Sequence, residues 1–263
     1  MGVLKTDGGG ADMHDGIYRK LCELLALEYN CEPGDFDGGE NRLTLPVLRP
    51  GRRAYSPEPP FFQMVTTGSC AVATADEELH PFLEGYLRKK PGHWLFELPN
   101  LLPLERELAR FGRTLTSTWH MFLPAGGGRE PLPLSLRWYY DEEILPFYGD
   151  PRFPNAICPA YKPERPDRIV VCAVEGEEII GMAGCSEDAP GWMQIGIDVM
   201  GPWRSKGVGS SLVKLLKDRI EERGAIPFYG TSLSNYHSWN VALNTGFRPA
   251  WVEIGSRKLL RGD

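Results

Sequence analysis

The chain has 263 residues, of which 42% are hydrophobic, so it can bury one large core or two ordinary ones without metals or disulfides. The net charge of −6 and the absence of any long run of Lys or Arg exclude the electrostatic pattern of nucleic-acid-binding proteins, and we expect no nucleic-acid partner. The six cysteines form no C-x-x-C pair and predict neither a zinc site nor a redox motif, so no metal is expected.

The first 16 residues lack the apolar core of a signal peptide. No stretch of the sequence approaches 18 uncharged apolar residues, the length typical of a membrane span. These two features predict a soluble cytoplasmic protein with no membrane partner.

Prolines and glycines interrupt the first half of the chain at two places. Residues 124–133, PAGGGREPLP, cannot continue a helix or a central strand and predict a boundary between an N-terminal α/β region, residues 1–127, and a second domain, residues 128–263. Residues 32–60 are too rich in Pro and Gly for regular structure. Between these segments, apolar spacing predicts strand, helix, strand, helix and strand over residues 61–75, 76–90, 93–98, 101–112 and 114–123.

The second half continues the α/β pattern. A strand from residue 134 runs into a short acidic helix, and residues 168–186 predict a hairpin that turns at Glu175-Gly176-Glu177. Residues 192–200 alternate apolar and polar side chains, which is typical of a strand with one buried face. A glycine-containing loop follows at once, then an amphipathic helix from Val208 ended by Gly224, and strands over 227–233 and 249–260 flank a further helical segment.

The loop after the strand of residues 192–200 is suited to hold a phosphate, because amides in the first turn of a helix have no partner inside the helix. A Walker-type loop requires Gly before Lys, but here Lys206 precedes Gly207. A dinucleotide-binding loop requires a third glycine where this chain has Leu212. What remains is the pattern R-x-x-G-x-G over residues 204–209.

At this loop the sequence resembles the GNAT acyltransferase superfamily, whose members hold the pyrophosphate of acetyl-CoA in such a loop. A second motif agrees: residues 235–247, NYHSWNVALNTGF, fit the family's N-x-x-S spacing ahead of a Gly-Phe pair. The resemblance covers roughly residues 134–260. It implies a central mixed sheet flanked by helices, and it leaves two alternatives for the first half: a degenerate half of the same fold, or an unrelated α/β domain.

The resemblance also implies a set of cofactor-binding residues. The strand before the loop diverges from the next strand in this family, and the pantetheine arm of the cofactor lies in the gap. Strand backbone, loop amides, basic side chains and the second motif would contribute Ile197, Val199, Arg204, Ser205, Lys206, Gly207, Val208, Gly209, Ser210, Asn235 and Ser238.

Acyl transfer to an amine also requires proton transfers. An alkyl amine with a pKa near 10.4 needs a general base at neutral pH, and Asp198, Glu175 and Glu178 are the carboxylate candidates. The family often places a tyrosine, as general acid for the leaving thiolate, where this chain has Ala242. Four nearby residues are candidates to replace it: Ser234, Tyr236, His237 and Ser238.

The family's layout places residues 137–161 across the mouth of the cofactor cleft. Six aromatic residues could line an acceptor slot there, and three acidic residues could attract a cation: Trp138, Tyr139, Tyr140, Phe147, Tyr148 and Phe153, with Asp141, Glu142 and Glu143. The alternative for the aromatic residues is the core, and for the acidic ones an ordinary first helical turn.

The prediction that follows is an acetyl-CoA-dependent N-acetyltransferase that acts on a small-molecule or peptide amine, as a monomer or homodimer. Direct attack in a ternary complex is the expected mechanism. The alternatives are an acyl-CoA-binding sensor or regulatory subunit without turnover, which the missing tyrosine favours, and a structural or interaction protein that uses no cofactor.

Overall fold

A computed structural model describes residues 8–260, with side chains from residue 16 onward. Residues 1–7 of the segment expected to lack a signal peptide therefore lie outside the described part. The described residues divide into two compact units, one containing Phe122–Pro249 and residues 8–14, the other Asp15–Met121 and residues 250–260. No helix among the described residues is long and apolar enough to cross a membrane.

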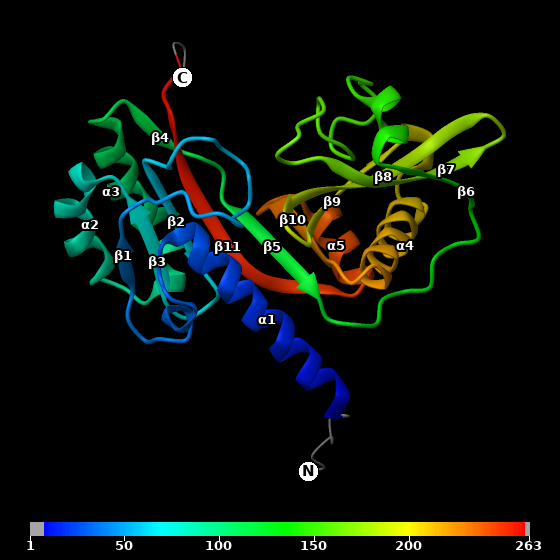
Figure 1. Cartoon of the computed structure of the whole chain (residues 1–263). Helices are drawn as coiled ribbons and strands as arrows, with labels where there is room; N and C mark the ends of the chain where they lie inside the picture. The colour runs from blue at the N-terminus through cyan, green and yellow to red at the C-terminus, as the bar shows by residue number, and fades with distance from the viewer. Residues whose placement is uncertain (1–7, 261–263) are drawn as a thin grey trace. The chain divides into compact units, whose positions relative to one another are not determined.

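The unit that contains Phe122–Pro249 is built on a mixed sheet whose strands follow the order β5, β10, β9, β8, β7, β6 (Figure 1). Only β10 and β9 of the pairs from β10 to β6 run parallel. The elements are β5 (Trp119–Pro124), β6 (Ser135–Tyr140), η4 (Asp141–Phe147), β7 (Asp167–Glu175), β8 (Glu178–Ala189), β9 (Trp192–Val199), η5 (Gly201–Trp203), α4 (Val208–Glu222), β10 (Ile226–Ser232) and α5 (Tyr236–Asn244).

Helix α4 packs its apolar stripe on one face of this sheet. Leu212, Leu216 and Ile220 are fully buried and belong to one core cluster with Ile169, Ala183 and Ile195 of the strands. The helix ends where Gly224 takes a φ of +76°, a conformation that favours glycine. The opposite face of the sheet carries a second cluster, which includes Ile144, Phe153 and Ile157.

The other unit also contains a mixed sheet, in which β1 runs parallel to β3 and the remaining pairs are antiparallel. Its elements are most of α1 (Gly8–Tyr29), η1 (Pro33–Phe36), β1 (Arg42–Thr44), β2 (Phe62–Thr66), β3 (Ala71–Ala75), η2 (Glu77–Leu79), α2 (His80–Leu87), η3 (Gly92–Phe96), α3 (Leu98–Ala109), β4 (Arg113–Leu115) and most of β11 (Phe247–Lys258). The α/β class with mixed sheets and flanking helices is thus confirmed.

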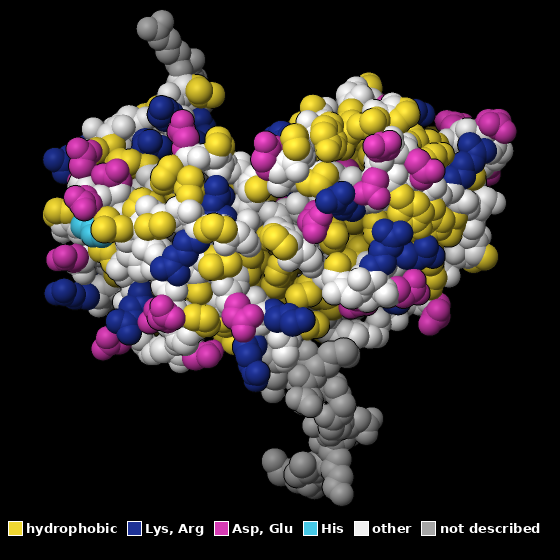
Figure 2. Space-filling model, in the orientation of Figure 1, with side chains coloured by type: hydrophobic (Ala, Val, Ile, Leu, Met, Phe, Trp, Pro, Cys, Tyr) yellow, Lys and Arg dark blue, Asp and Glu magenta, His cyan; other side chains and the backbone are white. Residues whose placement is uncertain are grey.

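Basic and acidic side chains alternate over the face of the molecule shown in Figure 2. Dark blue and magenta groups lie side by side there, with apolar atoms between them.

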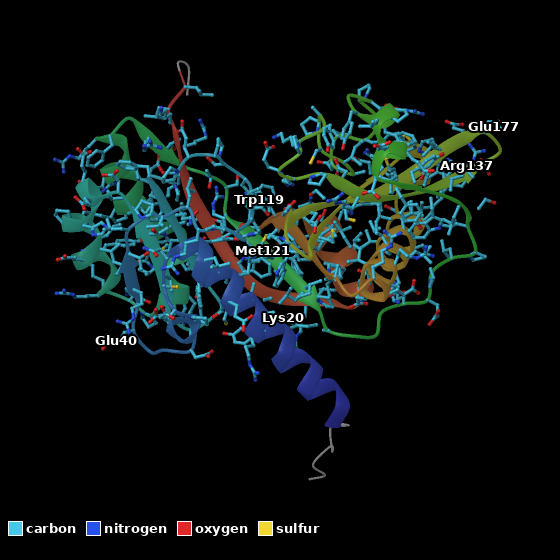
Figure 3. The ribbon with its side chains drawn as sticks, in the orientation of Figure 1. Lys20, Glu40, Trp119, Met121, Arg137 and Glu177 are labelled. Carbon is cyan, nitrogen blue, oxygen red and sulfur yellow. The ribbon has the colours of Figure 1, made fainter. Side chains whose placement is uncertain are left out.

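Most predicted elements of the second half are confirmed, including the hairpin. β7 and β8 pair up to Glu175 and Glu178, and Gly176 in the turn has a φ of +60°. Figure 3 shows Arg137 and Glu177 close together at the tip of this hairpin, where their charged groups lie 3.7 Å apart.

Three expectations for the first half were incomplete or wrong. Residues 61–75 form a hairpin of two strands instead of one, because the chain turns at Gly68 (φ +115°). The strand expected at 93–98 is the 3-10 helix η3, in which Trp94 N donates to Pro91 O at 3.1 Å. Helix α1 was not predicted, and η1 and β1 interrupt the segment 32–60 that was expected to be irregular.

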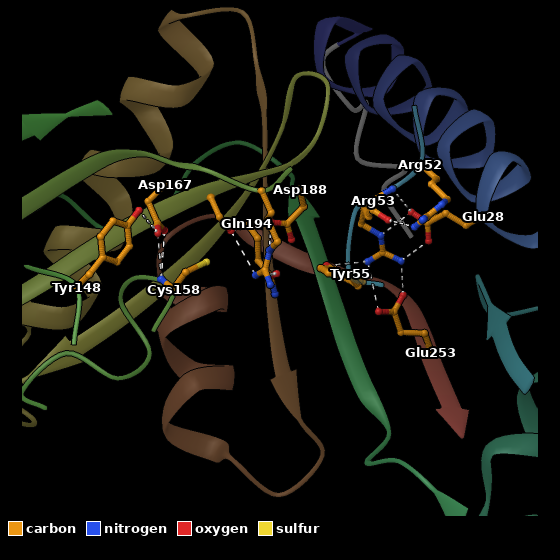
Figure 4. Close-up of polar contacts among 12 residues, drawn as sticks. Glu28, Arg52, Arg53, Tyr55, Tyr148, Cys158, Asp167, Asp188, Gln194 and Glu253 are labelled. Carbon is orange, nitrogen blue, oxygen red and sulfur yellow. Dashed lines mark hydrogen bonds and ion pairs between the residues drawn. The ribbon is translucent and has the colours of Figure 1, made fainter. Parts of the chain in front are cut away.

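A buried arginine holds together the unit that contains Asp15–Met121. Arg53 is 3% exposed, and its guanidinium donates to Glu28 Oε2 at 2.6 Å and to Glu253 Oε2 at 2.7 Å (Figure 4). Glu28 lies on α1 and Glu253 on β11, so one side chain connects an N-terminal helix to a strand near the end of the chain.

Candidate acyl-CoA site

The parallel strands β9 and β10 separate part-way along their length. They are paired from Trp192 with Ile226 to Ile195 with Tyr229, yet β9 continues to Val199 and β10 to Ser232. Over the rest of their described lengths the two strands have no register with each other. The predicted residues Ile197 and Val199 lie in this diverging part of β9, so their backbone groups face the gap between the strands.

The loop after β9 presents backbone amides at the start of α4. Ser205 and Gly207 take left-handed φ angles of +60° and +87°, and Gly207 is the N-cap of the helix. No side chain caps this end, and the first bond inside the helix runs from Ser211 N to Gly207 O at 3.0 Å. The amides of the first turn therefore remain available to an anion, which the helix dipole also favours.

The start of α4 lies directly against the diverging end of β9. A Cβ added at Gly209 would lie 3.3 Å from Val199 Cγ2 and 3.7 Å from Ile197 Cγ1. Arg204 Nε donates to Val199 O at 3.0 Å, and Lys206 Nζ lies 5.0 Å from the centre of the Trp203 ring. The structure thus brings the predicted strand and loop residues into one continuous surface, with two exposed cations beside the free amides.

The second predicted motif begins α5. Asn235 is the N-cap of this helix, and its Oδ1 accepts from Ser238 N at 3.2 Å, so its carbonyl oxygen already has a structural role. Ser234 and Asn235 are exposed, and Tyr236 is 74% exposed. Ala242, at the position of the family's tyrosine, is fully buried.

Asp198 is held by the segment that crosses the sheet in front of it. Its Oδ2 accepts from Asn155 N at 2.7 Å and from Ala156 N at 2.8 Å, and its Oδ1 accepts from Asn155 Nδ2 at 2.7 Å. The carboxylate therefore fixes residues 155–156 against β9. Its role as general base stays a prediction. In the structure its carboxylate binds the backbone and side chain of the crossing segment.

A second carboxylate fixes the same segment. Asp167 Oδ2 accepts from Cys158 N at 3.1 Å and from the Tyr148 hydroxyl at 3.0 Å (Figure 4). Burial raises the pKa of Asp167 above its ordinary value, while the hydrogen bonds from Tyr148 and Cys158 lower it. Residues 148–158 are thus held on the sheet at both ends.

The six aromatic residues expected in one acceptor slot lie on two faces of the sheet. Trp138 and Tyr140 pack with the α4 cluster, whereas Tyr139, Phe147, Tyr148 and Phe153 pack with the opposite cluster. Alternation along β6 sends neighbouring side chains to opposite faces. The prediction of a single slot is therefore wrong. The Arg219 guanidinium instead lies over the Trp138 ring and that of Arg223 over the Tyr140 ring, each 4.6 Å from the ring centre.

The acidic candidates for the acceptor slot and for the general base lie at different places in the fold. Asp141 pairs with Arg168 at 3.1 Å. Glu175 and Glu178 are exposed at the end of the β7 and β8 hairpin. Because Gly181 of β8 pairs with Val199, this turn lies at the same end of the sheet as the diverging part of β9.

Comparison with known protein families agrees with this geometry. The family model described as "Acetyltransferase (GNAT) family" matches residues 134–247, which contain the diverging strands, the loop and α5. Residues 134–247 form a GNAT-family domain.

Solved structures similar to the chain include other GNAT proteins. One is an acetyltransferase of Novosphingobium aromaticivorans described as putative (13% identity, TM-score 0.44, covering 55% of this chain and 66% of that one). Another is a GNAT-family acetyltransferase of Colwellia psychrerythraea (11%, 0.40, 54% and 56%). A third is a GCN5-related N-acetyltransferase-like protein of Streptococcus suis (11%, 0.44, 61% and 69%). The chain thus spans less than two thirds of the length of the first two, and no curated protein matches it.

One residue of the GNAT-family domain was missed by sequence reasoning. Tyr229 is 3% exposed and occupies the last position at which β10 pairs with β9. The apolar pattern of residues 227–233 predicts the strand, but only the register shows that this tyrosine stands where the strands part.

Proposed function

We propose that the GNAT-family domain binds acetyl-CoA and transfers its acyl group to an amine of a small molecule or peptide. One observation carries the proposal: the uncapped start of α4 lies against the part of β9 that has left its partner strand. Free amides for a pyrophosphate therefore lie beside a strand edge that has no partner strand and could pair with an amide-containing arm. A site for a mononucleotide phosphate alone needs only the first of these.

In this proposal the chain contributes position and charge. The amides from Ser205 to Ser210 bind the pyrophosphate, Arg204 and Lys206 add positive charge, and the edge of β9 pairs with the pantetheine arm. Asp198 acts through residues 155–156, which it holds beside the gap, and the amine loses its proton to solvent in this cleft.

A second candidate function is acyl-CoA binding without turnover. It is favoured by Ala242 in place of a tyrosine and by an Asp198 whose oxygens already accept three hydrogen bonds. The two candidates differ in one measurement, the release of free CoA in the presence of an amine.

Calorimetric titration of acetyl-CoA, CoA and ATP tests the binding step. Ser205 already has a left-handed φ, which Asn and Asp tolerate better than most residues, so Ser205→Asn and Ser205→Asp differ from each other mainly in charge. We expect acetyl-CoA and CoA to bind and ATP to bind far more weakly. Ser205→Asp should bind CoA at least about tenfold more weakly than Ser205→Asn, because it places a negative charge beside the phosphates.

Equal affinities of the two variants would contradict the anion site at this loop. If no CoA species binds, the loop is a plain turn. If CoA binds and a screen of amines releases no free thiol, the non-catalytic candidate holds.

A further inference from the structure

The domain lacks an acid at the usual place for protonating the leaving group. Cleavage of a thioester releases a thiolate, and the residue on α5 that would face it is the fully buried Ala242. Of the candidates from the sequence, Ser234 and Tyr236 are exposed at the start of α5. The inference below rests on the proposed acyl transfer and concerns the proton in that step.

Tyr229 stands at the point where the cofactor gap begins. Its backbone pairs with Ile195, and beyond these two residues β9 and β10 diverge. Tyr229 and Ile195 belong to the same core cluster with Leu212 and Val213, so the phenol lies on the face of the sheet that α4 and α5 cover.

The ring of Tyr229 is fixed and its hydroxyl is not isolated. Phe122 and Phe247 lie against the ring, with centroid distances of 6.5 and 6.1 Å. The Ser238 side chain of α5 is near enough to lower the pKa of this hydroxyl. It also lies within electrostatic range of Asp198, on the diverging part of β9. The ring is thus fixed in the core on the α4 side of the sheet, at the position where β9 and β10 part.

The protonation state of this phenol suits an acid. Burial raises the pKa of Tyr229 above its usual 10.0, the hydrogen bond with Ser238 lowers it, and the negative charge of Asp198 raises it. With its pKa above that of an ordinary tyrosine, the side chain carries its proton at neutral pH.

We propose that Tyr229 donates the proton taken up by the thiolate that leaves acyl-CoA, from a strand position instead of from α5, with Ser238 positioning its hydroxyl. The amine nitrogen forms a bond to the thioester carbon, and the bond from carbon to sulfur breaks. The phenol proton passes to sulfur and gives free CoA thiol. The surplus proton on the nitrogen leaves through solvent and restores the phenol, so the products are the amide and CoA.

The test compares wild type with Tyr229→Phe, which removes only the hydroxyl. Tyr86→Phe is the matched control, because Tyr86 is also buried (4% exposed) and its hydroxyl donates to Leu95 O at 3.3 Å in the other unit. CoA affinity is measured by calorimetry, turnover by thiol release with an accepted amine, and the pKa of the thiol of bound CoA by the absorbance of its thiolate.

We expect Tyr229→Phe to bind CoA within about threefold of wild type and to turn over about a hundredfold more slowly. The thiol of CoA bound to Tyr229→Phe should have a pKa about one unit higher than in wild type, because a hydrogen bond to the thiolate is lost. Tyr86→Phe should match wild type in all three measurements.

Ser238 acts through Tyr229, so its test is a pH profile. Loss of its contact raises the pKa of Tyr229, and the alkaline fall of kcat should move to higher pH in Ser238→Ala and return in Ser238→Thr.

The outcomes separate the inference from the proposed function. Turnover by Tyr229→Phe equal to that of wild type overturns the inference and leaves acyl transfer intact. If no amine is accepted, an unchanged thiol pKa in the variant overturns it, since the hydroxyl then does not reach sulfur. Failure of the wild type to bind CoA overturns the proposed function itself, and the inference with it.

Discussion

Gly184 of β8 pairs directly with Gly196 of β9, and the segment from Asn155 to Ala156 crosses the sheet over both of them. A Cβ at Gly196 would overlap the Asn155 carbonyl oxygen, and one at Gly184 would overlap the Ala156 carbonyl oxygen. Two facing glycines therefore leave room for a backbone that Asp198 then binds through the Asn155 and Ala156 amides.

We expect Gly196→Ala to destabilise the protein by ~1–3 kcal/mol, because the added methyl must displace the backbone at Asn155. The midpoint of urea unfolding measures this. Gly85→Ala is the matched control: it lies in α2 with nothing within 4 Å of the added Cβ, and it should be neutral or stabilising by up to ~1 kcal/mol. Equal midpoints for the two variants would disprove the close crossing.

Asp198→Asn should free the crossing segment. The amide side chain offers one acceptor oxygen instead of two, so at least one donor of residues 155–156 loses its partner, at a cost of ~1–3 kcal/mol. Limited proteolysis near residues 150–160 should accelerate, while the affinity for CoA stays within about threefold. Unchanged stability and unchanged proteolysis in Asp198→Asn would show that Asp198 does not hold this segment.

Alkylation of the cysteines should be slow in the native protein. All six are buried and free, and burial raises the pKa of the Cys158 thiol from 9.0 to about 11. At pH 8 its thiolate fraction is ~100-fold below that of a thiol at 9.0, and labelling should rise about tenfold per pH unit toward pH 11. Peptide mapping by mass spectrometry measures this, with labelling in urea as the reference. Rapid labelling of Cys158 at pH 8 in the folded protein would contradict its burial.

We expect Arg53→Met to lower the free energy of unfolding of the unit that contains Asp15–Met121. It leaves the carboxylates of Glu28 and Glu253 without the guanidinium that both contact, a loss of ~3–5 kcal/mol. Arg110→Met serves as the control, because Arg110 pairs with Glu107 with its side chain 72% exposed and should change stability by less than ~1 kcal/mol. Hydrogen exchange in β2 and β11 would report the loss locally, and a loss no larger than that of Arg110→Met would show that the network is not stabilising.

The elements of the GNAT-family domain follow from local sequence, since alternation marks β9, a stripe marks α4 and Gly224 ends it. The loop motif also pointed to strand and loop residues that the structure brings together on one surface. What could not be predicted depends on the partner of each group. The sequence around Asp198 is the same whether its side chain faces a substrate or binds Asn155. Tyr229 looks like any tyrosine in a strand until its register with Ile195 is known.

The first half shows the same limit. The run from His93 to Glu97 is apolar enough for a strand, but Pro91 and the proline in the first turn of α3 favour helical turns on either side. Whether this half descends from a second acyltransferase fold stays a prediction, as does the boundary at residue 127.

The three glycines that suggested that boundary have a different use. Gly126, Gly127 and Gly128 all have φ angles between +69° and +109°, and a Cβ at Gly128 would lie 2.8 Å from the Thr245 backbone. Ala125 N donates to Gly246 O at 2.8 Å and Arg129 N to Asn244 O at 2.7 Å, while Leu132 N reaches Ser211 Oγ at 2.9 Å. This stretch runs from the end of α5 to the start of α4. These glycines are therefore a poor place to cut, lengthen or tag the chain in protein engineering. A single inserted residue would shift Leu132, whose side chain lies against Gly207.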